Sequence, residues 1–195
     1  MTVLTSPPCT PEEYLRMERN ASLKSEYING QIYAMAGASR RHNLITFNLA
    51  MELGPQLTGQ DCEAYLNDMR VKVSPTTYTY PDVVAVCGEP RFEDNEVDTL
   101  LNPQVIIEVL SPSTEARDRG VKFAQYRRIA SLTDYVLIDQ DRVGVEHYKR
   151  EGDRWMLNEI MDLQGNLQLE SISCRLSLQG IYNKIRFAEY GDDTG

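Results

Sequence analysis

The sequence predicts an α/β or α+β domain in which a mixed β-sheet is flanked by helices. Three observations support this prediction. Short apolar runs typical of strands recur along the chain, segments with apolar residues at helical spacing separate some of them, and no internal repeat or low-complexity stretch is visible. With 195 residues the chain can form a single sizeable core, so we expect one domain over residues 1–195 with its core at about 10–178.

The N-terminal third predicts a helix, a hairpin and a second helix. Residues 10–19 begin with a capping box, TPEE, that has proline at the first helical position. Asn29 and Gly30 separate two short apolar segments, which predicts a hairpin with a type I′ turn. Ser39 is expected to cap a longer helix, whose leucines and isoleucine recur at helical spacing as far as Leu57.

The rest of the chain is rich in strand patterns. Strands are expected at residues 62–66, 69–73, 80–86, 103–110, 134–139 and 144–150, with further strand-like segments at 154–160 and 166–172. Residues 88–102 form a polar stretch that predicts a surface loop. A helix is expected from about Glu115 or Arg119 to Ile129, and a short closing helix within residues 176–185.

Composition is that of an ordinary globular protein, with 42% hydrophobic and 25% charged residues. No apolar run approaches the roughly 18–20 residues that span a bilayer. The N-terminal stretch has neither the basic nor the apolar segment of a secretory signal.

The four cysteines are scattered and form no CxxC pair, which favours reduced thiols over a disulfide framework or a zinc site. We therefore expect a cytoplasmic protein without membrane contacts.

The net charge of −9 disfavours indiscriminate binding of nucleic acid, because an acidic protein repels a polyanion at long range. Basic residues nevertheless cluster locally, at Arg40, Arg41, Arg117, Arg119, Lys122, Arg127 and Arg128. An acidic protein with such a patch can still bind a polyanion, although not through its bulk charge.

Two acidic residues interrupt strands that are otherwise apolar. Asp82 directly precedes the run VVAV, and Glu108 lies in PQVIIEVL, where alternation places it on one face with Ile106 and Leu110. A carboxylate beside such a run must be solvated, paired or bound to a cation. If the two strands are neighbours, the carboxylates repel each other unless a cation neutralises them, and such oxygen ligands suit Mg²⁺ or Mn²⁺.

Lys122 is the basic residue that fits the same site. On the predicted helix it lies on or beside the apolar face formed by Phe123, Tyr126 and Ile129, which is expected to pack on the sheet. A lysine in this position should have a carboxylate or a bound anion near it, unless its stem snorkels to solvent. Lys72, in the strand pattern RVKV, is the alternative lysine.

Structural interpretations compete with these assignments. Asp82 follows a proline and could simply begin a strand, and Glu108 could pair with an arginine in the core. Glu26 precedes the hairpin turn and could be a solvated strand residue. His42 and His147 are isolated in the sequence, and lone histidines are more often structural or exposed than catalytic, so neither is assigned a role.

Several segments carry a resemblance to a known family. They are YPDVVAV, then IIEVLSPST with Glu108 26 residues after Asp82, then RDRGVKFAQYRR. LKSEYINGQIYAMAGASRRHNLI and SLTDYVLIDQDRVGVEHYKREGDRW extend the similarity over about residues 10–178. Together they resemble the Uma-type family of putative restriction endonucleases, a branch of the PD-(D/E)XK nuclease superfamily. The resemblance implies a restriction-endonuclease-like fold.

The resemblance also implies a set of site residues. Asp82 and Glu108, with the carbonyl of Val109, would bind Mg²⁺ or Mn²⁺, and Glu26 would contribute a further acid. The superfamily pattern E-x-K places a lysine two residues after the second acid, where this chain has a leucine. The implied replacement is Lys122 on the next helix, where it would orient the attacking water or offset charge on phosphorus.

The implied activity is hydrolysis of phosphodiester bonds in nucleic acid, chiefly DNA, by a homodimer whose two sites address two strands. Arg117 and Arg119 flank the proposed site and could contact DNA. Two alternatives stay open. The net charge of −9 and the displaced lysine suggest a catalytically inactive nuclease fold that binds nucleic acid or protein. The acidic composition also suits hydrolysis of a smaller phosphodiester or nucleotide.

Overall fold

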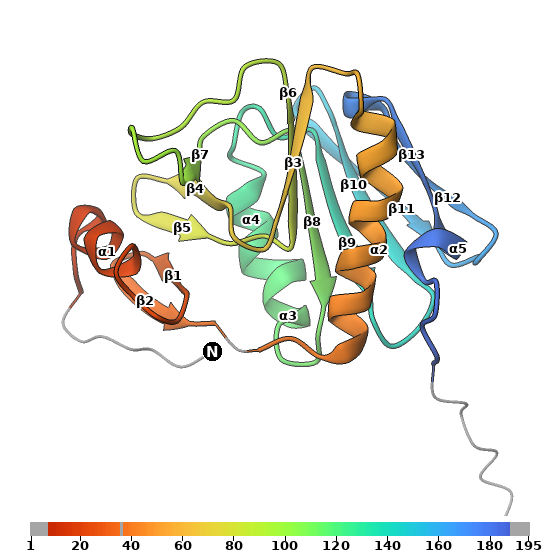
Figure 1. Ribbon diagram of the computed structural model, residues 1–195, viewed down its shortest axis with the longest axis horizontal. Helices are drawn as coiled ribbons and strands as arrows, with labels where there is room; N and C mark the ends of the chain where they lie inside the picture. Colours follow the sequence, from red (N-terminus) through yellow and green to blue (C-terminus); the bar gives the residue numbers. More distant parts are fainter. Residues whose placement is uncertain (1–7, 36, 188–195) are drawn as a thin grey trace, which may run out of the picture.

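The computed structural model describes residues 8–35 and 37–187, and it confirms the expected mixed fold of strands and helices. Within these residues, the strands form three sheets of five, six and two strands rather than one sheet (Figure 1). The first seven residues, which belong to the stretch considered for a secretory signal, lie outside the described residues. Among the described helices, none is both long enough and apolar enough to cross a membrane.

A five-stranded sheet with one helix forms the N-terminal side of the protein. Its elements are α1 (Pro11–Glu18), β1 (Ser25–Ile28), β2 (Gln31–Ala34), β4 (Arg70–Ser74), β5 (Thr77–Thr79) and β7 (Thr99–Leu100), with the strand order β2-β1-β5-β4-β7. The predicted capping box is present, because Thr10 and Glu13 each accept a hydrogen bond from the other's backbone N–H. Asn29 and Gly30 have φ values of 49° and 88°, as the type I′ hairpin requires.

The central six-stranded sheet carries most of the core. It contains β3 (Cys62–Leu66), β6 (Val83–Cys87), β8 (Val105–Leu110), β9 (Asp134–Asp139), β10 (Val145–Glu151) and β11 (Arg154–Ile160), in the order β11-β10-β9-β8-β6-β3. The pair β8–β9 is parallel, and the other pairs are antiparallel.

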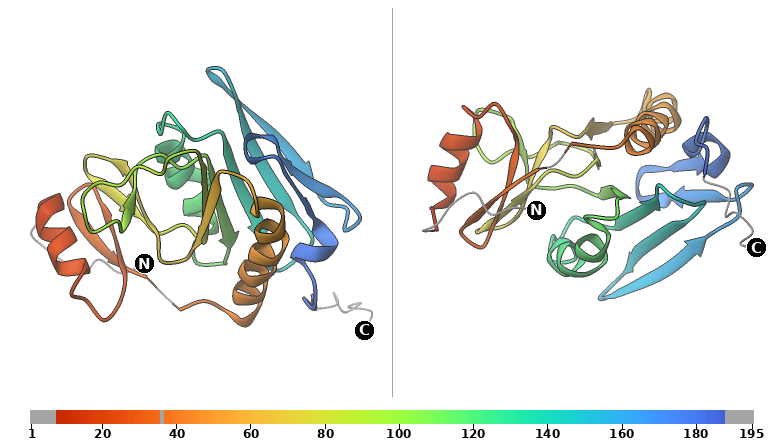
Figure 2. Two further views of the ribbon diagram at one scale, coloured as in Figure 1. Left: turned by 45° about the horizontal axis from the view of Figure 1, so that its top comes forward. Right: turned by 90° about the horizontal axis from the view of Figure 1, so that it is seen from below.

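Helices cover both faces of the central sheet (Figure 2). One face packs against α2 (Arg40–Leu57), together with β12 (Asn166–Leu169), β13 (Cys174–Ser177) and α5 (Leu178–Ile181). The other face packs against α3 (Glu115–Arg117), the π-helix η1 (Asp118–Lys122) and α4 (Phe123–Tyr126). Strand β8 contributes Ile107 to the first core and Ile106 to the second, as its alternation predicts.

Some elements differ from the sequence-based expectations. The helix expected to reach Ile129 ends at Tyr126 and consists of three short helices with the π-helix in the middle. The polar stretch 88–102 contains β7, which pairs in parallel with β4. Strands β5 and β13 and the 3-10 helix Glu170–Ile172 were not predicted. These short elements depend on pairing with distant segments, which local sequence patterns do not reveal.

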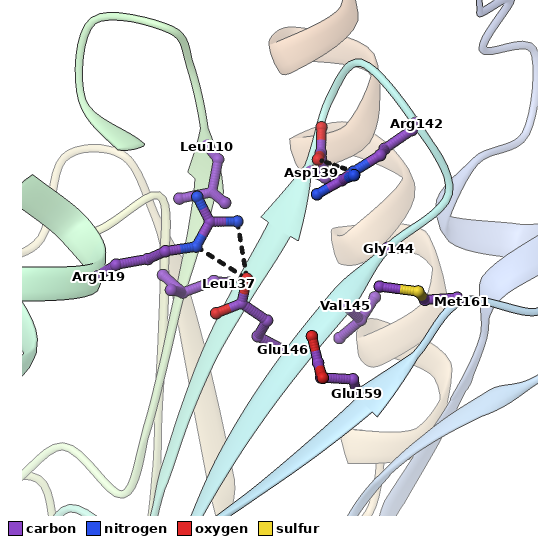
Figure 3. A pocket seen from close by; sticks show the side chains of 10 residues that line it. All are labelled: Leu110, Arg119, Leu137, Asp139, Arg142, Gly144, Val145, Glu146, Glu159 and Met161. Carbon is purple, nitrogen blue, oxygen red and sulfur yellow. Dashed lines mark hydrogen bonds and ion pairs between the residues drawn. The ribbon is translucent and has the colours of Figure 1, made fainter. Parts of the chain in front are cut away.

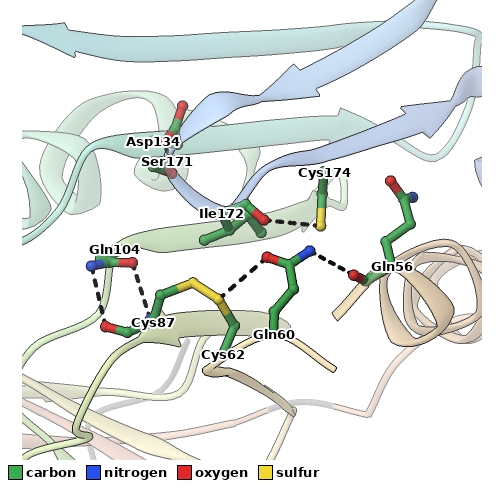
Figure 4. Close-up of a disulfide and its surroundings, with 9 residues drawn as sticks. All are labelled: Gln56, Gln60, Cys62, Cys87, Gln104, Asp134, Ser171, Ile172 and Cys174. Atoms are coloured by element: carbon green, nitrogen blue, oxygen red, sulfur yellow. Dashed lines mark hydrogen bonds between the residues drawn. A yellow bond between two sulfur atoms is a disulfide. The ribbon is translucent and has the colours of Figure 1, made fainter. Parts of the chain in front are cut away.

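The cysteines require a second correction. Cys62 and Cys87 form a disulfide between β3 and β6, so the expectation of reduced thiols is wrong for this pair (Figure 4). The two residues lie opposite each other in the antiparallel ladder, with their Cα atoms 3.9 Å apart. They are 25 residues apart in the sequence, so only the strand pairing brings them together. Cys9 and Cys174 are free, as expected.

Reduction of the Cys62–Cys87 bond is expected to lower the free energy of unfolding by about 3 kcal/mol, because the bond restricts a loop of 25 residues in the unfolded chain. Urea denaturation with and without a phosphine reductant measures this difference, and Cys9→Ser is the control because Cys9 is free. Thiol titration of the unfolded, unreduced protein should detect two of the four cysteines. Detection of all four would show that the bond is absent.

Candidate active site

Strands β6 and β8 bring Asp82 and Glu108 together at one end of their ladder. Val83 pairs with Ile107 in antiparallel register, and the two acids follow directly beyond this pair on their own strands. Asp82 Oδ2 accepts a hydrogen bond of 2.7 Å from the backbone N–H of Val109. The two strands are neighbours, which is the condition under which the sequence analysis expects the two carboxylates to repel each other unless a cation neutralises them.

Glu108 is held by hydrogen bonds from two buried side chains. It is 4% exposed and lies on the face of β8 that packs against α4. Its Oε1 accepts one hydrogen bond from Lys122 Nζ and one from the Tyr126 hydroxyl, each 2.9 Å long. The Tyr126 hydroxyl also contacts the hydroxyl of Thr79 on β5, at 2.9 Å. A chain of polar contacts thus connects Glu108 to the five-stranded sheet.

Lys122 points into the protein and is only 5% exposed. Its Nζ lies 2.9 Å from Glu108 Oε1, 3.4 Å from Asp118 Oδ1 and 3.5 Å from Glu26 Oε1. Asp118 and Lys122 are four residues apart within η1, so both belong to the same helical segment. One ammonium group is therefore surrounded by three carboxylates.

Glu26 lies on β1 of the five-stranded sheet, is completely buried and extends toward Lys122. Its Oε2 lies 2.7 Å from the guanidinium of Arg117, and its Oε1 faces Lys122 and the backbone N–H of Tyr80. The alternative that Glu26 is a solvated strand residue is therefore wrong. Glu26 instead links β1 to the helical segment that follows β8.

The cluster contains more acidic than basic groups. Its members are the carboxylates Glu26, Asp82, Glu108 and Asp118 and the cations Lys122 and Arg117. Burial, together with the charges of Asp118 and Asp82, raises the pKa of Glu108 to about 8 against the opposing effect of Lys122. Burial alone would lower the pKa of Lys122, but the carboxylates around it raise that pKa well above its usual range. A divalent cation would relieve this excess of negative charge.

A cavity of about 510 Å³ opens onto the cluster and is lined by Asp82, Glu108 and Lys122. The first turn of α2 and the loop 111–114 also line it. Asp82 Oδ1 and Glu108 Oε2 accept no hydrogen bond from the described residues, since the contacts of both groups go to Oδ2 and Oε1. Each carboxylate therefore keeps one oxygen available for a ligand in the cavity.

The oxygen atoms of Asp82 and Glu108 are ligands of the kind that suits Mg²⁺ or Mn²⁺. Within the described residues, no three His, Cys, Asp or Glu side chains are arranged to hold a metal ion together. Mg²⁺ does not need such a cage, because one or two carboxylates commonly hold it while water and substrate phosphates complete the octahedron. The N–H and C=O of a strand residue point to the same side, so the Val109 carbonyl faces the side on which Asp82 lies. Asp82, Glu108 and Val109 would hold the ion.

The other candidates lie elsewhere or are paired. Lys72, the alternative lysine, is paired with Glu93 and does not line the cavity. His147 lies 2.7 Å from Asp134 Oδ1 and is buried, in agreement with the structural interpretation. His42, by contrast, lines the cavity, and its Nε2 is 3.1 Å from Asp82 Oδ2.

The two arginines considered for DNA contacts are paired with carboxylates of the protein. Arg117 turns inward to Glu26. Arg119 lies 2.7 Å from Glu146 and also contacts Glu115, beside a small cavity of about 20 Å³ near the ends of β8 and β9 (Figure 3). Their carboxylate partners offset the positive charge that each guanidinium would offer to a substrate phosphate.

Several contacts of the site were not predicted. Asp118 precedes Lys122 by four residues, a helical spacing that could have indicated the contact. Tyr126 was expected only to pack against the sheet, and its hydrogen bond to Glu108 depends on how α4 docks. The contact between His42 and Asp82 has no sequence signal, because it arises from the placement of α2 over the end of β6.

Substitution of Lys122 by Met is expected to lower the free energy of unfolding by about 3–5 kcal/mol, because it removes a cation from among buried carboxylates. Urea denaturation at neutral pH measures the effect, and adding Glu108→Gln should recover part of the loss. Lys24→Met is the matched control: Lys24 also lines the cavity, but its side chain is 40% exposed, so a change below about 1 kcal/mol is expected. Equal stability of the two single variants would contradict the ion-pair account.

Comparison with known proteins places the chain in a family. A family model described as "Uma2: Putative restriction endonuclease" matches residues 11–181. Among curated proteins, the chain is 44% identical to the uncharacterized protein sll1609 of Synechocystis, over 83% of this chain and 92% of the relative. It is 38% identical to the uncharacterized protein slr1290 of the same organism, over 93% and 95%.

A solved structure shares the fold at low sequence identity. It is the crystal structure of a putative nuclease belonging to DUF820 from Anabaena variabilis, with a TM-score of 0.75 and 19% identity. The match covers 90% of this chain and 98% of that chain, so the likeness of the folds extends over most of this chain. By the match of the family model and the identity to both relatives, the chain belongs to the Uma2 family of putative restriction endonucleases.

Proposed function

We propose that the protein is a Mg²⁺-dependent endonuclease that hydrolyses phosphodiester bonds, with DNA as its substrate. Membership of the Uma2 family supports the nuclease class. The observation that carries the proposal is the pair of carboxylates, Asp82 and Glu108, beside the buried Lys122. Both line one cavity, and each has one oxygen without a hydrogen bond from the described residues. Paired oxygen ligands of this kind are what a phosphoryl-transfer site requires for Mg²⁺.

In the proposed reaction, a water oxygen forms a bond to phosphorus while one ester P–O bond breaks. Bound Mg²⁺ would supply Lewis-acid chemistry, polarising the phosphate and making water more acidic. Asp82, Glu108 and the Val109 carbonyl would hold the ion at the cavity floor. The ammonium of Lys122 would offset the negative charge that develops on the phosphoryl oxygens.

The other buried groups act on Lys122 rather than on the substrate. Glu26 and Asp118 lie 3.5 and 3.4 Å from its Nζ, and both are almost completely buried. Tyr126 donates to the same oxygen of Glu108 as Lys122 does. We therefore assign these three residues to positioning Lys122 and Glu108. This differs from the role of an additional metal-binding acid that the family resemblance suggests for Glu26.

The proposal includes the homodimer expected for double-strand cleavage. A single cavity addresses one phosphodiester, so a monomer would nick duplex DNA, whereas a dimer could cut both strands in one encounter. Supercoiled plasmid distinguishes these outcomes, because a nick gives the relaxed circle and a double cut gives the linear form. Light scattering of the same preparation gives the mass of the active species.

Asp82→Asn and Glu108→Gln are each expected to reduce DNA cleavage by at least about 100-fold, because each substitution removes a charged ligand at the reacting phosphate. Plasmid cleavage in Mg²⁺ or Mn²⁺ measures the loss. Asp68→Asn is the matched control: this carboxylate pairs with Lys24, is 82% exposed and does not line the cavity, so activity should stay unchanged. Full activity in both site variants would show that the site is wrong. Metal-independent DNA binding without cleavage by the wild type would instead favour an inactive nuclease fold.

Mg²⁺ is expected to raise the melting temperature of the wild-type protein, because the ion binds only the folded state. At an ion concentration 100 times the dissociation constant, the gain corresponds to about 2.7 kcal/mol. Thermal unfolding with Mg²⁺, and after removal of the ion with a chelator, measures it, and sodium chloride of equal ionic strength controls for screening. An equal shift in Asp82→Asn would place the stabilising ion elsewhere.

A further inference from the structure

The chemistry proposed above gives no role to His42, which lines the cavity beside Asp82. His42 is one of only two histidines in the chain, and its side chain is 14% exposed. Its Nε2 lies 3.1 Å from Asp82 Oδ2. Nε2 is thus within reach of a carboxylate oxygen to which an imidazole N–H can donate.

The backbone around His42 is firmly anchored. His42 lies in the first turn of α2, and its N–H donates to the side chain of Ser39, the N-cap residue of the helix. Ser39 is in turn hydrogen-bonded to the Gln140 side chain, which follows β9. The imidazole therefore approaches Asp82 from a helix terminus that is attached to the central sheet.

The two oxygens of Asp82 have different surroundings. Oδ2 lies between the Val109 N–H, at 2.7 Å, and the His42 imidazole, at 3.1 Å. Oδ1 accepts no hydrogen bond from the described residues. One oxygen of the carboxylate is thus contacted from two sides, and the other has no hydrogen bond from the described residues.

A second histidine–aspartate pair in the same protein shows the contrast. His147 contacts Asp134 Oδ1, while Thr133 and Ser171 both donate to Asp134 Oδ2. Both oxygens of Asp134 are therefore occupied by the protein, and neither residue lines the cavity beside Asp82. This pair has the arrangement expected of a structural contact, whereas the pair His42–Asp82 keeps one oxygen open.

We infer that His42 is a positioning residue that orients the Asp82 carboxylate for a divalent cation. The inference rests on the proposed function, because it needs a cation at Asp82. When a residue that contacts and orients a metal ligand is removed, the metal affinity or the activity commonly falls by about 10- to 100-fold. His42 acts through Asp82 and needs no contact with the substrate.

The test is calorimetric titration of Mn²⁺ and Mg²⁺ into the wild type and into His42→Ala, His42→Gln and Asp82→Asn. We expect His42→Ala to weaken binding by about 10- to 100-fold, and Asp82→Asn to abolish it. His42→Gln should restore most of the affinity, because its side-chain amide can donate where Nε2 does. His147→Gln is the matched control, expected to lower the melting temperature without changing the affinity for the ion.

The outcomes separate this inference from the proposed function. If the wild type binds the ion, Asp82→Asn does not, and His42→Ala binds as well as the wild type, the positioning role is wrong and the metal site stands. Tighter binding by His42→Ala would show that the imidazole competes with the cation, which also overturns the inference. A folded His42→Gln that binds no better than His42→Ala would exclude the donor role. Absence of binding by the wild type would overturn both the inference and the metal site.

Discussion

The buried ammonium of Lys122 is the interaction on which the architecture of the site depends. It lies within 3.5 Å of carboxylates from β1, β8 and η1, which belong to two different sheets and a helix. Burying Glu26, Glu108 and Asp118 beside the partly exposed Asp82 is costly unless cations and hydrogen bonds offset these carboxylates, and Lys122 and Arg117 offset only part of their charge. Burial above all, together with the charges of Asp118 and Asp82, raises the pKa of Glu108 despite the opposing effect of Lys122. A divalent cation at the open oxygens would complete the neutralisation.

The central sheet supplies the rigidity that this arrangement needs. β6 and β8 are buried on both faces, so their register is strongly specified, and a slip of one residue would turn Glu108 from the α4 face toward the α2 face. The same register places the Val109 N–H against Asp82. The helical segment after β8 then returns Lys122 to the strand that carries Glu108. Fold and site are thus produced by the same few pairings.

Much of the fold and part of the site could be predicted from local patterns. Asp82 and Glu108 stand out because each carboxylate accompanies an apolar strand, and Lys122 stands out because it adjoins an apolar helix face. The partners of these residues were harder to predict. His42 and Arg117 acquire their roles through the docking of helices on distant strands. The disulfide between Cys62 and Cys87 likewise depends on strand pairing, for which a spacing of 25 residues gives no signal. Contacts between segments far apart in the chain are the part that one sequence does not reveal.

The most direct test of the account is the position of a bound ion. A crystal of the protein soaked in Mn²⁺ allows the ion to be located by its anomalous scattering. The account predicts a peak in the cavity between Asp82 and Glu108, with Oδ1, Oε2 and the Val109 carbonyl as the protein ligands that would hold the ion. A fully loaded crystal with Mn²⁺ only at other positions, and with Asp82 and Glu108 unchanged around an ion-free cavity, would contradict the central claim.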